Sequence, residues 1–290
     1  MILVIGSSGQ LAKELKCLMG EEELVAVGRH DIDVTNIIDM SETLNRYQPS
    51  AIINASAYTA VDKAESDADN AYLLNQHAVA NLAKYADKNG CHLVHVSSDY
   101  VFDGAKGSPY LVGDDYNPQG VYGASKAAGE KAMQFLCTEH ACILRTSWVY
   151  SQHGNNFVKT MLRLMSEKPE LGVIDDQIGS PTSAKALAEA CLYAAQHKVT
   201  GIHHFTDAGV ASWYDFAVAI QRQALGKNML NSAIPIRPIP SSAYPTPAKR
   251  PSYSVLDKST LKEAFNGLQP KHWQTELDKV LEQIKSNTGS

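Results

Sequence analysis

Lys126 stands four residues after Tyr122, and no other of the thirteen tyrosines is followed by a lysine at this distance. On a helix, residues four apart lie on the same face. A phenol titrates near pH ~10 and an adjacent ammonium favours the phenolate, so we expect Lys126 to lower the pKa of Tyr122. Such a phenol can exchange a proton with substrate near neutral pH. The alternative is a solvated pair on a helix surface.

Ser98 follows the apolar run 93–97, which we expect to be a buried strand. In open α/β sheets, ligands bind beyond the carboxyl ends of the strands. A hydroxyl there can bond the substrate oxygen that Tyr122 protonates, so we expect Ser98 to act with Tyr122 and Lys126. The alternative for Ser98 is the cap of a turn at the strand end.

A glycine-containing loop, Gly6-Ser7-Ser8-Gly9-Gln10-Leu11-Ala12, joins the first expected strand to the first expected helix with GxxGxxA spacing. Glycine permits a tight turn and close approach of the backbone to a ligand. The start of the helix offers free N–H groups and the positive end of its dipole to a pyrophosphate. We expect a dinucleotide to bind here, and a plain turn is the alternative.

The choice of dinucleotide depends on the residues after the second expected strand, where Arg29 is followed by Asp31 and Asp33. An arginine pairs with the 2′-phosphate of NADP, whereas an acidic residue bonds the ribose 2′-hydroxyl of NAD. Arg29 therefore favours NADPH and leaves NADH open. The alternative for Arg29 is a solvated loop charge.

Runs rich in valine and isoleucine alternate with helical patterns over the first half of the chain. We expect strands at 2–6, 24–28, 51–56, 93–97 and 142–149, and helices at 10–19, 36–47, 70–88 and 121–139. Strands that are apolar on both faces suit a parallel sheet covered by helices on each side. The alternation predicts a Rossmann-type, doubly wound α/β fold for residues 1–150.

Beyond about residue 151 helical stretches dominate, at 156–167, 184–197, 213–225 and 271–285, with a strand at 201–206. Ser212 and Asp215 form a capping pair for the third of these helices. Six prolines between Pro235 and Pro251 predict a stiff, irregular segment without helix or central strand. We expect residues 151–290 to form a smaller, mainly helical substrate-binding region, with an approximate boundary and segments that cross back.

Composition argues for a small-molecule partner. The 290 residues are 44% hydrophobic and carry a net charge of −5, which disfavours binding to nucleic acid or to an anionic membrane. No apolar run approaches the ~20 residues that span a bilayer, and the chain opens on a strand without a basic leader, so we expect it in the cytoplasm. Five cysteines without CxxC spacing predict small, buried thiols in a reducing compartment.

Several motifs resemble the extended short-chain dehydrogenase/reductase family: residues 6–12, 54–65, 96–104 and Tyr122-Gly123-Ala124-Ser125-Lys126. Four more are similar to the dTDP-4-dehydrorhamnose reductases within it: residues 145–150, 154–157, 175–182 and 244–251. The similarity runs from Gly6 to about Trp273. The resemblance implies that NADPH or NADH gives a hydride to the C4 carbonyl of dTDP-4-dehydro-6-deoxy-L-mannose, which yields dTDP-L-rhamnose.

The resemblance also implies roles for particular residues. Tyr122 would be the proton donor, Lys126 its electrostatic partner and cofactor anchor, and Ser98 the hydroxyl that completes the triad. Many members carry threonine in place of Ser98, so the missing β-methyl predicts a looser hydroxyl. The positions that match cofactor contacts, with the loop glycine, are Gly6, Gly9, Gln10, Leu11, Asp33, Val34, Ala57, Tyr58, Thr59, Ser98 and Asp99.

For the substrate, Trp148 matches a sugar-nucleotide contact. Lys249 and Arg250, fixed between prolines, suit a diphosphate because arginine presents a planar fork and little entropy remains to be lost; the alternative is a rigid, solvated loop. Some relatives bind Mg²⁺, but the sequence yields no ligand set for a metal. We expect a monomer or a homodimer.

Two other functions stay open at this stage. A nucleotide-sugar epimerase or dehydratase shares the same loop and the Tyr122–Lys126 motif, but it recycles its hydride. A eukaryotic relative serves as a non-catalytic regulatory subunit of methionine adenosyltransferase. The intact set of Ser98, Tyr122 and Lys126 favours an enzyme over such a subunit.

Overall fold

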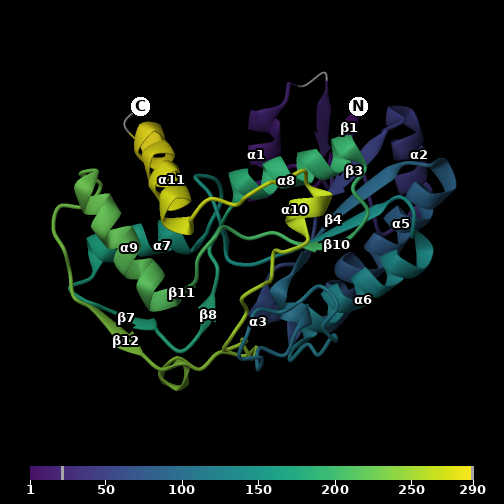
Figure 1. Cartoon of the computed structure of the whole chain (residues 1–290). Coiled ribbons are helices and arrows are strands. Elements are labelled where there is room, and N and C mark those ends of the chain that lie inside the picture. The colour runs from purple at the N-terminus through teal and green to yellow at the C-terminus, as the bar shows by residue number, and fades with distance from the viewer. Residues whose placement is uncertain (21–22, 289–290) are drawn as a thin grey trace.

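A computed structural model describes residues 1–20 and 23–288. Its larger part is built on a parallel sheet of six strands in the order β10-β5-β4-β3-β1-β2 (Figure 1). The strands are β1 (Ile2–Ile5), β2 (Leu24–Val27), β3 (Ala51–Asn54), β4 (His92–Ser98), β5 (Ala141–Thr146) and β10 (Gly201–His204). The predicted doubly wound α/β fold is confirmed.

Helices cover both faces of this sheet, which is why its strands are apolar on both sides. On one face, α1 (Gln10–Leu18) and α8 (Ala184–His197) pack against each other and share a core with the strands. On the other face, a second core joins the strands to α2 (Ile37–Tyr47), α5 (Ala78–Asn89) and α6 (Val121–Leu136). Figure 1 shows the three layers.

The order of the strands creates the crevice in which a ligand can bind. From β1 the chain moves to β2 on one side, and it then crosses to β3 on the other side of β1. The loops that follow β1 and β3 therefore leave the sheet at the point where the winding reverses, which is where open α/β sheets bind their ligands. Both cavities described below lie at this edge of the sheet.

The helix that precedes β4 is interrupted. The chain passes from α3 (Val61–Ala64) and α4 (Ala68–Tyr72) through a π-helical segment, Leu73–His77, directly into α5. A continuous α-helix over 70–88 was the expectation. A π turn inserts an extra residue into the hydrogen-bond ladder, and such turns often lie next to functional sites.

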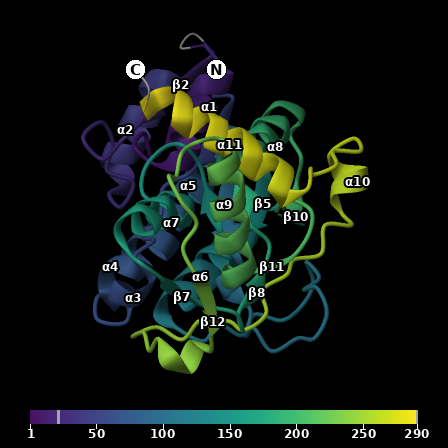
Figure 2. The ribbon, with the colours of Figure 1, turned by 90° about the vertical axis from the view of Figure 1, so that its left-hand side faces the viewer.

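The second part of the molecule is mainly helical. Helices α7 (Phe157–Glu167), α9 (Trp213–Gly226) and α11 (Trp273–Thr288) enclose a separate core (Figure 2). The predicted capping pair is confirmed: Ser212 and Asp215 form a capping box at the start of α9. Short strand pairs complete this part, β6 (Val149–Tyr150) with β9 (Thr182–Ser183), and β8 (Ile178–Gly179) with β11 (Ala211–Ser212).

Segments from the second half of the chain return to the first sheet. Strand β10 pairs in parallel with β5 and forms the edge of the six-stranded sheet, and α8 packs on α1. The short helix α10 (Leu261–Ala264) adds Leu261 to the same core. The two halves therefore share one hydrophobic core beneath α1 and α8.

Two sequence expectations need correction. Residues 236–239 of the proline-rich segment form a strand, β12 (Ile236–Ile239), which pairs with β7 (Leu171–Ile174). Pro238 is tolerated because this is a two-stranded sheet, where a proline can face away from the partner; a short 3₁₀ turn, Ser241–Ala243, follows. Cys17 is exposed, whereas the other four cysteines are buried as expected.

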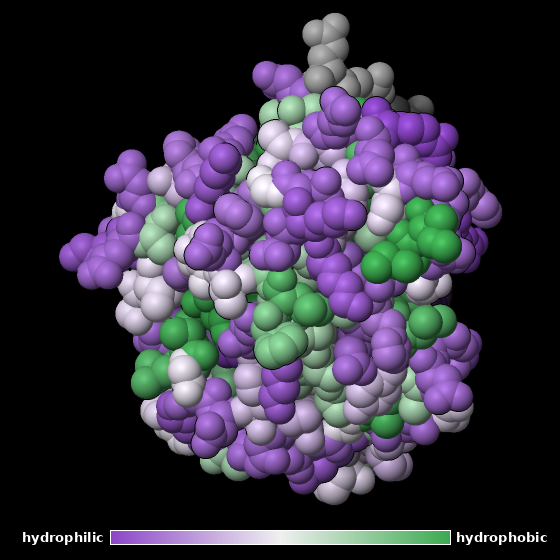
Figure 3. All heavy atoms as spheres, turned by 90° about the vertical axis from the view of Figure 1, so that its right-hand side faces the viewer, coloured by the Kyte–Doolittle hydropathy of each residue, from purple (hydrophilic) through white to green (hydrophobic). Residues whose placement is uncertain are grey.

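The surface over α2, α5 and α6 is mostly hydrophilic, with separate apolar areas between the charged side chains (Figure 3). Isolated exposed apolar residues are common on folded proteins. Within residues 1–20 and 23–288, no helix has the length and apolar character needed to cross a bilayer.

Candidate active site

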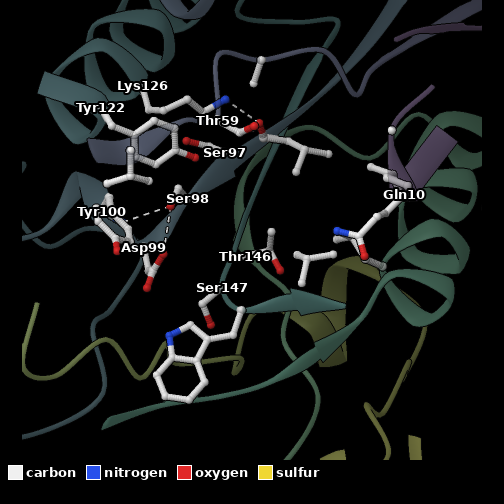
Figure 4. A pocket seen from close by; sticks show the side chains of 18 of the residues that line it. Gln10, Thr59, Ser97, Ser98, Asp99, Tyr100, Tyr122, Lys126, Thr146 and Ser147 are labelled. Carbon is white, nitrogen blue, oxygen red and sulfur yellow. Dashed lines mark hydrogen bonds between the residues drawn. The ribbon is translucent and has the colours of Figure 1, made fainter. Parts of the chain in front are cut away.

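A cavity of about 680 Å³ opens at the carboxyl ends of the central strands, and we call it the central cavity. Ser98, Tyr122 and Lys126 all line it, so the structure brings together the three residues that the spacing singled out. Figure 4 shows these residues with Asp99 and Tyr100 on one side of the cavity, and Gln10 of α1 on the far side.

Ser98 ends strand β4 and is buried. Its Oγ accepts a hydrogen bond from the backbone N–H of Tyr100 (3.2 Å) and donates one to Oδ1 of Asp99 (2.8 Å). Ser98 therefore caps the short 3₁₀ turn that follows the strand, as the alternative interpretation expected. These contacts also hold the hydroxyl at the wall of the cavity, which compensates for the absent β-methyl group.

Tyr122 is the second residue of α6, and close packing at the start of this helix places it beside the end of β4. A Cβ on Gly123 would lie 2.1 Å from the carbonyl oxygen of Tyr100, so only glycine lets the helix approach the turn this closely. The Tyr100 and Tyr122 rings meet edge to face with their centroids 5.4 Å apart. The backbone N–H of Val121 donates to Glu65 (2.8 Å), which ties the helix start to α3.

Burial raises the pKa of Tyr122 to about 12; a hydrogen bond with Ser98 opposes this rise and the charge of Asp99 adds to it. Burial also raises the pKa of Asp99 to about 6. The expectation that Lys126 lowers the pKa of Tyr122 is wrong for the protein without ligand, because burial outweighs any effect of the amine. A phenol in this state is a proton donor rather than a base at neutral pH.

Lys126 is 1% exposed, so the solvated surface pair is excluded. Its Nζ donates to the carbonyl oxygen of Val96 (2.7 Å) and lies 3.2 Å from Nε2 of His95. Burial lowers the pKa of Lys126 to about 8, against the opposing charge of Glu130. The amine is thus held against strand β4.

A second cavity of about 700 Å³, which we call the side cavity, adjoins the central one. Gly6, Arg29, Asp33 and Val34 line it, and both cavities share the glycine loop and the segment after β3, through Ser8, Gly9, Ala55, Ser56, Ala57 and Thr59. The two cavities together run from the end of β2 to Tyr122. This is the course that an extended dinucleotide follows across such a sheet.

The glycine loop fits a pyrophosphate. Gly6 has a φ of +106°, and a Cβ there would lie 3.1 Å from the backbone nitrogen of Ser56, so a side chain would be strained and crowded. Gly9 caps α1 without any side-chain hydrogen bond to the first turn. The first N–H groups of α1 therefore face the cavities unblocked, which is the arrangement that binds phosphate at a helix start.

At the outer end of the side cavity, Arg29 is exposed. Asp33 is engaged by the next turn, because its Oδ1 accepts from the backbone N–H (2.9 Å) and the hydroxyl (2.7 Å) of Thr35. These bonds hold the pKa of Asp33 below its usual range. The carboxylate that could bond a ribose is thus partly satisfied by its own loop, and the Arg29 guanidinium is open to solvent.

Two expected contacts lie outside the residues that line the cavities. The Tyr58 hydroxyl donates to Asp67 (3.0 Å), and its backbone N–H and carbonyl are bound by the Asn75 side chain (2.9 and 3.1 Å). Lys249 is exposed and donates to Gln119 (3.2 Å). The hydroxyl and both backbone polar groups of Tyr58 are therefore engaged within the protein, and Lys249 is a solvated loop cation in this conformation.

Arg250 does line the central cavity. Its guanidinium makes a two-pronged pair with Asp62 of α3, with distances of 3.0 and 2.7 Å. The hydrogen bond from Arg250 holds the pKa of Asp62 below its usual range. Asp62 thus fixes the direction of the guanidinium at the cavity mouth.

Trp148 also lines the central cavity, and its ring stacks on Trp213 with centroids 3.5 Å apart. Trp148 has a positive φ of 49°. Sequence reasoning placed Trp213 at the start of an expected helix and gave it no place in the cavity, which it also lines. The capping box was the available signal, since it makes Trp213 the first residue of α9, directly after β11.

Other lining residues that sequence reasoning missed include Tyr100, Thr146, Ser147, Asn155 and Gln177. They come from four separate segments, and each lies inside a motif that carries the family resemblance, although no role was assigned to it from the sequence. Among the described residues, no group of three or more histidine, cysteine, aspartate or glutamate side chains is arranged to hold a metal ion.

Comparisons with known proteins agree over almost the whole chain. Residues 1–286 match the family model described as RmlD substrate binding domain. A dTDP-4-dehydrorhamnose reductase of Aggregatibacter actinomycetemcomitans is 40% identical over 288 residues, covering 96% of this chain and 97% of that protein. One of Escherichia coli K12 is 40% identical over 297 residues, covering 99% of both.

Solved structures give the same picture. A dTDP-4-dehydrorhamnose reductase from Clostridium acetobutylicum superposes with a TM-score of 0.91 at 38% identity, covering 98% of this chain and 99% of that one. A dTDP-4-dehydrorhamnose reductase from Bacillus anthracis, in complex with NADP, superposes with a TM-score of 0.91 at 33% identity, covering 97% of this chain and 98% of that one. The predicted resemblance is confirmed, and the chain belongs to the RmlD substrate binding domain family.

Proposed function

We propose that this protein reduces the C4 carbonyl of dTDP-4-dehydro-6-deoxy-L-mannose to give dTDP-L-rhamnose, with NADPH or NADH as the reductant. The observation that carries the proposal is the shared wall of the two cavities. Ser98, Tyr122 and Lys126 line a space that continues past the glycine loop to the end of β2. Relatives that are 40% identical over nearly the full chain bear the name dTDP-4-dehydrorhamnose reductase, which supports the same reaction.

A bound nicotinamide cofactor supplies the hydride, and the residues of this chain do the rest. Tyr122 donates its phenolic proton to the C4 oxygen, a role that suits a tyrosine whose pKa burial raises to about 12. The Ser98 hydroxyl lies at the same wall and orients that oxygen by hydrogen bonding. Lys126 binds the cofactor ribose beside Tyr122 and, once charged, stabilises the phenolate that remains.

For the cofactor, the first turn of α1 receives the pyrophosphate, with Gly6 and Gly9 allowing close approach. Gln10, Leu11, Ala57, Thr59 and Asp99 line the wall along which the dinucleotide lies. Tyr58, between Ala57 and Thr59, holds this segment in place through its bonds to Asp67 and Asn75. Arg29 is exposed at the end of the side cavity, and Val34 and the engaged Asp33 line that cavity. We therefore propose NADPH as the preferred reductant, because a guanidinium pairs with a 2′-phosphate.

For the substrate, Trp148 offers a flat apolar surface that its stack on Trp213 holds in place. Arg250 presents a guanidinium to the diphosphate, and Lys249 adds a solvated charge at the mouth. We assign residues 1–150 mainly to binding of the cofactor and residues 151–290 mainly to binding of the substrate.

We also place the protein in the cytoplasm, as a monomer or a homodimer. All five thiols are free, which supports a reducing compartment.

The test is a spectrophotometric assay of NADPH and NADH oxidation with dTDP-4-dehydro-6-deoxy-L-mannose as substrate. The proposal expects one reduced cofactor consumed per sugar converted, with NADPH used more efficiently than NADH. An epimerase or dehydratase would convert a nucleotide sugar with no net oxidation, because it recycles its hydride. Absence of turnover with either cofactor, together with tight binding to a methionine adenosyltransferase, would indicate a regulatory subunit instead.

A further inference from the structure

A chain of buried hydrogen bonds leads from the cavity wall to the amine of Lys126. Ser56 follows β3 and lines both cavities. Its backbone N–H (3.1 Å) and its hydroxyl (2.7 Å) both donate to Oδ1 of Asn54. Nδ2 of Asn54 lies 3.1 Å from Nδ1 of His95, and Nε2 of His95 lies 3.2 Å from Nζ of Lys126. Asn54, His95 and Lys126 are each 1% exposed or less.

The backbone N–H of Ser56 determines which group donates in each of these hydrogen bonds. A backbone N–H can only donate, so the atom of Asn54 that faces Ser56 must be the oxygen, and the amide cannot be flipped. The amide nitrogen then faces His95 and can only donate, so Nδ1 of His95 carries no proton. Burial and Lys126 hold the pKa of His95 well below its usual range, so the ring is neutral. Its single proton therefore lies on Nε2.

A protonated Nε2 faces Lys126 as a donor, and a donor needs an acceptor. An ammonium has three N–H groups and no lone pair, whereas a neutral amine can accept one bond and still donate another. The Lys126 nitrogen donates to the Val96 carbonyl (2.7 Å), which the neutral form satisfies as well. Only a neutral amine completes both bonds.

We propose that His95 is a positioning residue which, through this chain, holds Lys126 as a neutral amine against strand β4 until a ligand in the cavities draws a proton onto it. The role of the ligand rests on the proposed function. The protonation state of Lys126 in the ligand-free protein does not.

The charges around Lys126 are consistent with this assignment. On its own helix, Glu130 favours the charged form, but its carboxylate is already paired with Arg145 of β5 at 2.8 Å. Tyr122, on the same helix, is neutral in this state, since its pKa is raised to about 12. Strand β3 contributes the neutral Asn54, and β4 contributes His95. Burial lowers the pKa of Lys126 to about 8 against the opposing charge of Glu130, and this pKa falls further when the partner of the amine is a donor.

This arrangement lets the protonation state of the Lys126 amine change when a ligand binds. While it is neutral, Lys126 cannot stabilise the phenolate of Tyr122, so the proton stays on the phenol. The phosphates and ribose hydroxyls of a bound dinucleotide favour the charged form and offer the amine new acceptors. Binding should therefore be accompanied by uptake of a proton from solvent by Lys126.

The first test uses the ligand-free wild-type protein. Lysine labelled with ¹³C at Cε is titrated by NMR, and the Lys126 signal is identified by its loss in Lys126→Met. Labelling of histidine with ¹⁵N reports the tautomer of His95. The inference expects an Nε2–H tautomer and a Lys126 midpoint below about 7, compared with ~10.4 for an ordinary lysine. An Nδ1–H tautomer, or a midpoint of about 7 or above, overturns it.

The second test reverses the donor and acceptor roles in the hydrogen bonds from Asn54 to Lys126. In Asn54→Asp both carboxylate oxygens accept, so His95 must carry its proton on Nδ1 and present a lone pair to Lys126. The inference expects the Lys126 midpoint to rise by about 1 to 3 pH units. Asn45→Asp on α2 introduces the same charge outside this series of hydrogen bonds and should leave the Lys126 midpoint unchanged. An unchanged midpoint in folded Asn54→Asp contradicts the inference, and the wild-type titration decides the matter if that variant does not fold.

The third test measures protons taken up when NADP⁺ binds, by calorimetry in buffers of different ionisation enthalpy. We expect up to one proton per bound NADP⁺ at neutral pH for wild type and almost none for Asn54→Asp. Binding without proton uptake in wild type contradicts the responsive role of Lys126. No binding of NADP⁺ at all would count against the proposed function and leave the result of the first titration standing.

Discussion

Arg145 of β5 and Glu130 of α6 form a two-pronged ion pair inside the protein, with both side chains 1% exposed or less. Nε of Arg145 lies 3.1 and 3.0 Å from the two carboxylate oxygens, and Nη2 lies 2.8 Å from Oε2. The Ser97 hydroxyl and the Tyr116 hydroxyl also donate to this carboxylate. The pair thus joins the helix that carries Tyr122 and Lys126 to the strands beneath it.

Breaking this pair should destabilise the fold strongly. Glu130→Gln leaves the Arg145 guanidinium buried without a counter-charge, so we expect a loss of about 3–5 kcal/mol in the free energy of unfolding. Denaturant unfolding measures the loss. Glu167→Gln is the matched control, because its partner Arg163 is exposed and such pairs contribute about 0.5 kcal/mol or less. Equal losses in the two variants would contradict the assigned importance of the buried pair.

Tyr122→Phe removes only the hydroxyl that is proposed to protonate the substrate. We expect kcat to fall about 10²- to 10⁴-fold, while the unfolding midpoint and the Kd for NADP⁺ stay close to wild type. Steady-state kinetics and calorimetry provide the measurements. Tyr47→Phe, at an exposed position at the end of α2, is the control and should keep full activity. Near-normal turnover in Tyr122→Phe would exclude this residue as the proton donor.

A methyl group at Gly179 should disturb the stacked rings of Trp148 and Trp213 in the proposed substrate site. A Cβ at this position would lie 2.8 Å from Cε2 of Trp148 and 2.8 Å from Oγ of Ser254, so Trp148 must move. Overpacking costs about 1–3 kcal/mol, and we expect KM for the nucleotide sugar to rise about tenfold in Gly179→Ala. Gly113→Ala, which meets no atom within 4 Å, should not change KM. A higher Kd for NADP⁺ with an unchanged sugar KM would argue against this role of Trp148.

The two neighbouring cations Lys249 and Arg250 should behave differently. Arg250 lines the cavity and is held by Asp62, whereas Lys249 is exposed and bonds to Gln119. We expect Arg250→Ala to raise KM for the nucleotide sugar about 10- to 100-fold, as the loss of a charged hydrogen bond does. Lys249→Ala serves as the control and should alter KM much less. If the two substitutions raise KM equally, the diphosphate lies nearer the loop than proposed.

Asp207 should make stability depend on pH. It is 0% exposed, its Oδ2 accepts from the Ser183 N–H (2.9 Å), and burial raises its pKa to about 8. The unfolded chain ionises this group near pH ~4, so the folded state holds the extra proton between pH ~4 and ~8. Stability therefore falls as pH rises through this window, by at most about 1.4 kcal/mol per pH unit, and then levels off.

Asp207→Asn removes the ionisation, so its free energy of unfolding relative to wild type should increase from pH 5 to about pH 8. Denaturant unfolding at both pH values measures the difference. Asp115→Asn, at an exposed position, should show no such trend. A difference between Asp207→Asn and wild type that stays constant across the window would mean that Asp207 titrates normally in the fold.

The sequence predicted the parts of the site that local patterns determine. Strand β4 and helix α6 follow from apolar runs and helical periodicity, and these elements place Ser98, Tyr122 and Lys126 at one wall of the cavity. The glycine loop likewise needs only the first strand and helix. In each case the position of a side chain follows from its own element and from the rule that parallel strands end at one edge.

The sequence did not predict contacts that depend on distant segments. Trp213 reaches the cavity because β8 pairs with β11, and Arg250 points inward because Asp62, 188 residues earlier, holds it. Tyr58 turns away because Asp67 and Asn75 bind it, and the π-helical segment that carries Asn75 has no sequence signal. The pKa of Tyr122 was mispredicted because spacing reports which groups are neighbours and not how deeply they are buried.

Strand β10 gives the six-stranded sheet its outer border, although it lies fifty residues beyond the point where the cofactor-binding segment was expected to end. Without β10, the backbone N–H and C=O groups of β5 would form an open edge able to recruit strands from other chains. Residues 1–150 therefore complete their sheet only with a strand from the second half of the chain. Both halves should therefore unfold in one transition, and a fragment that ends near residue 150 should not fold by itself.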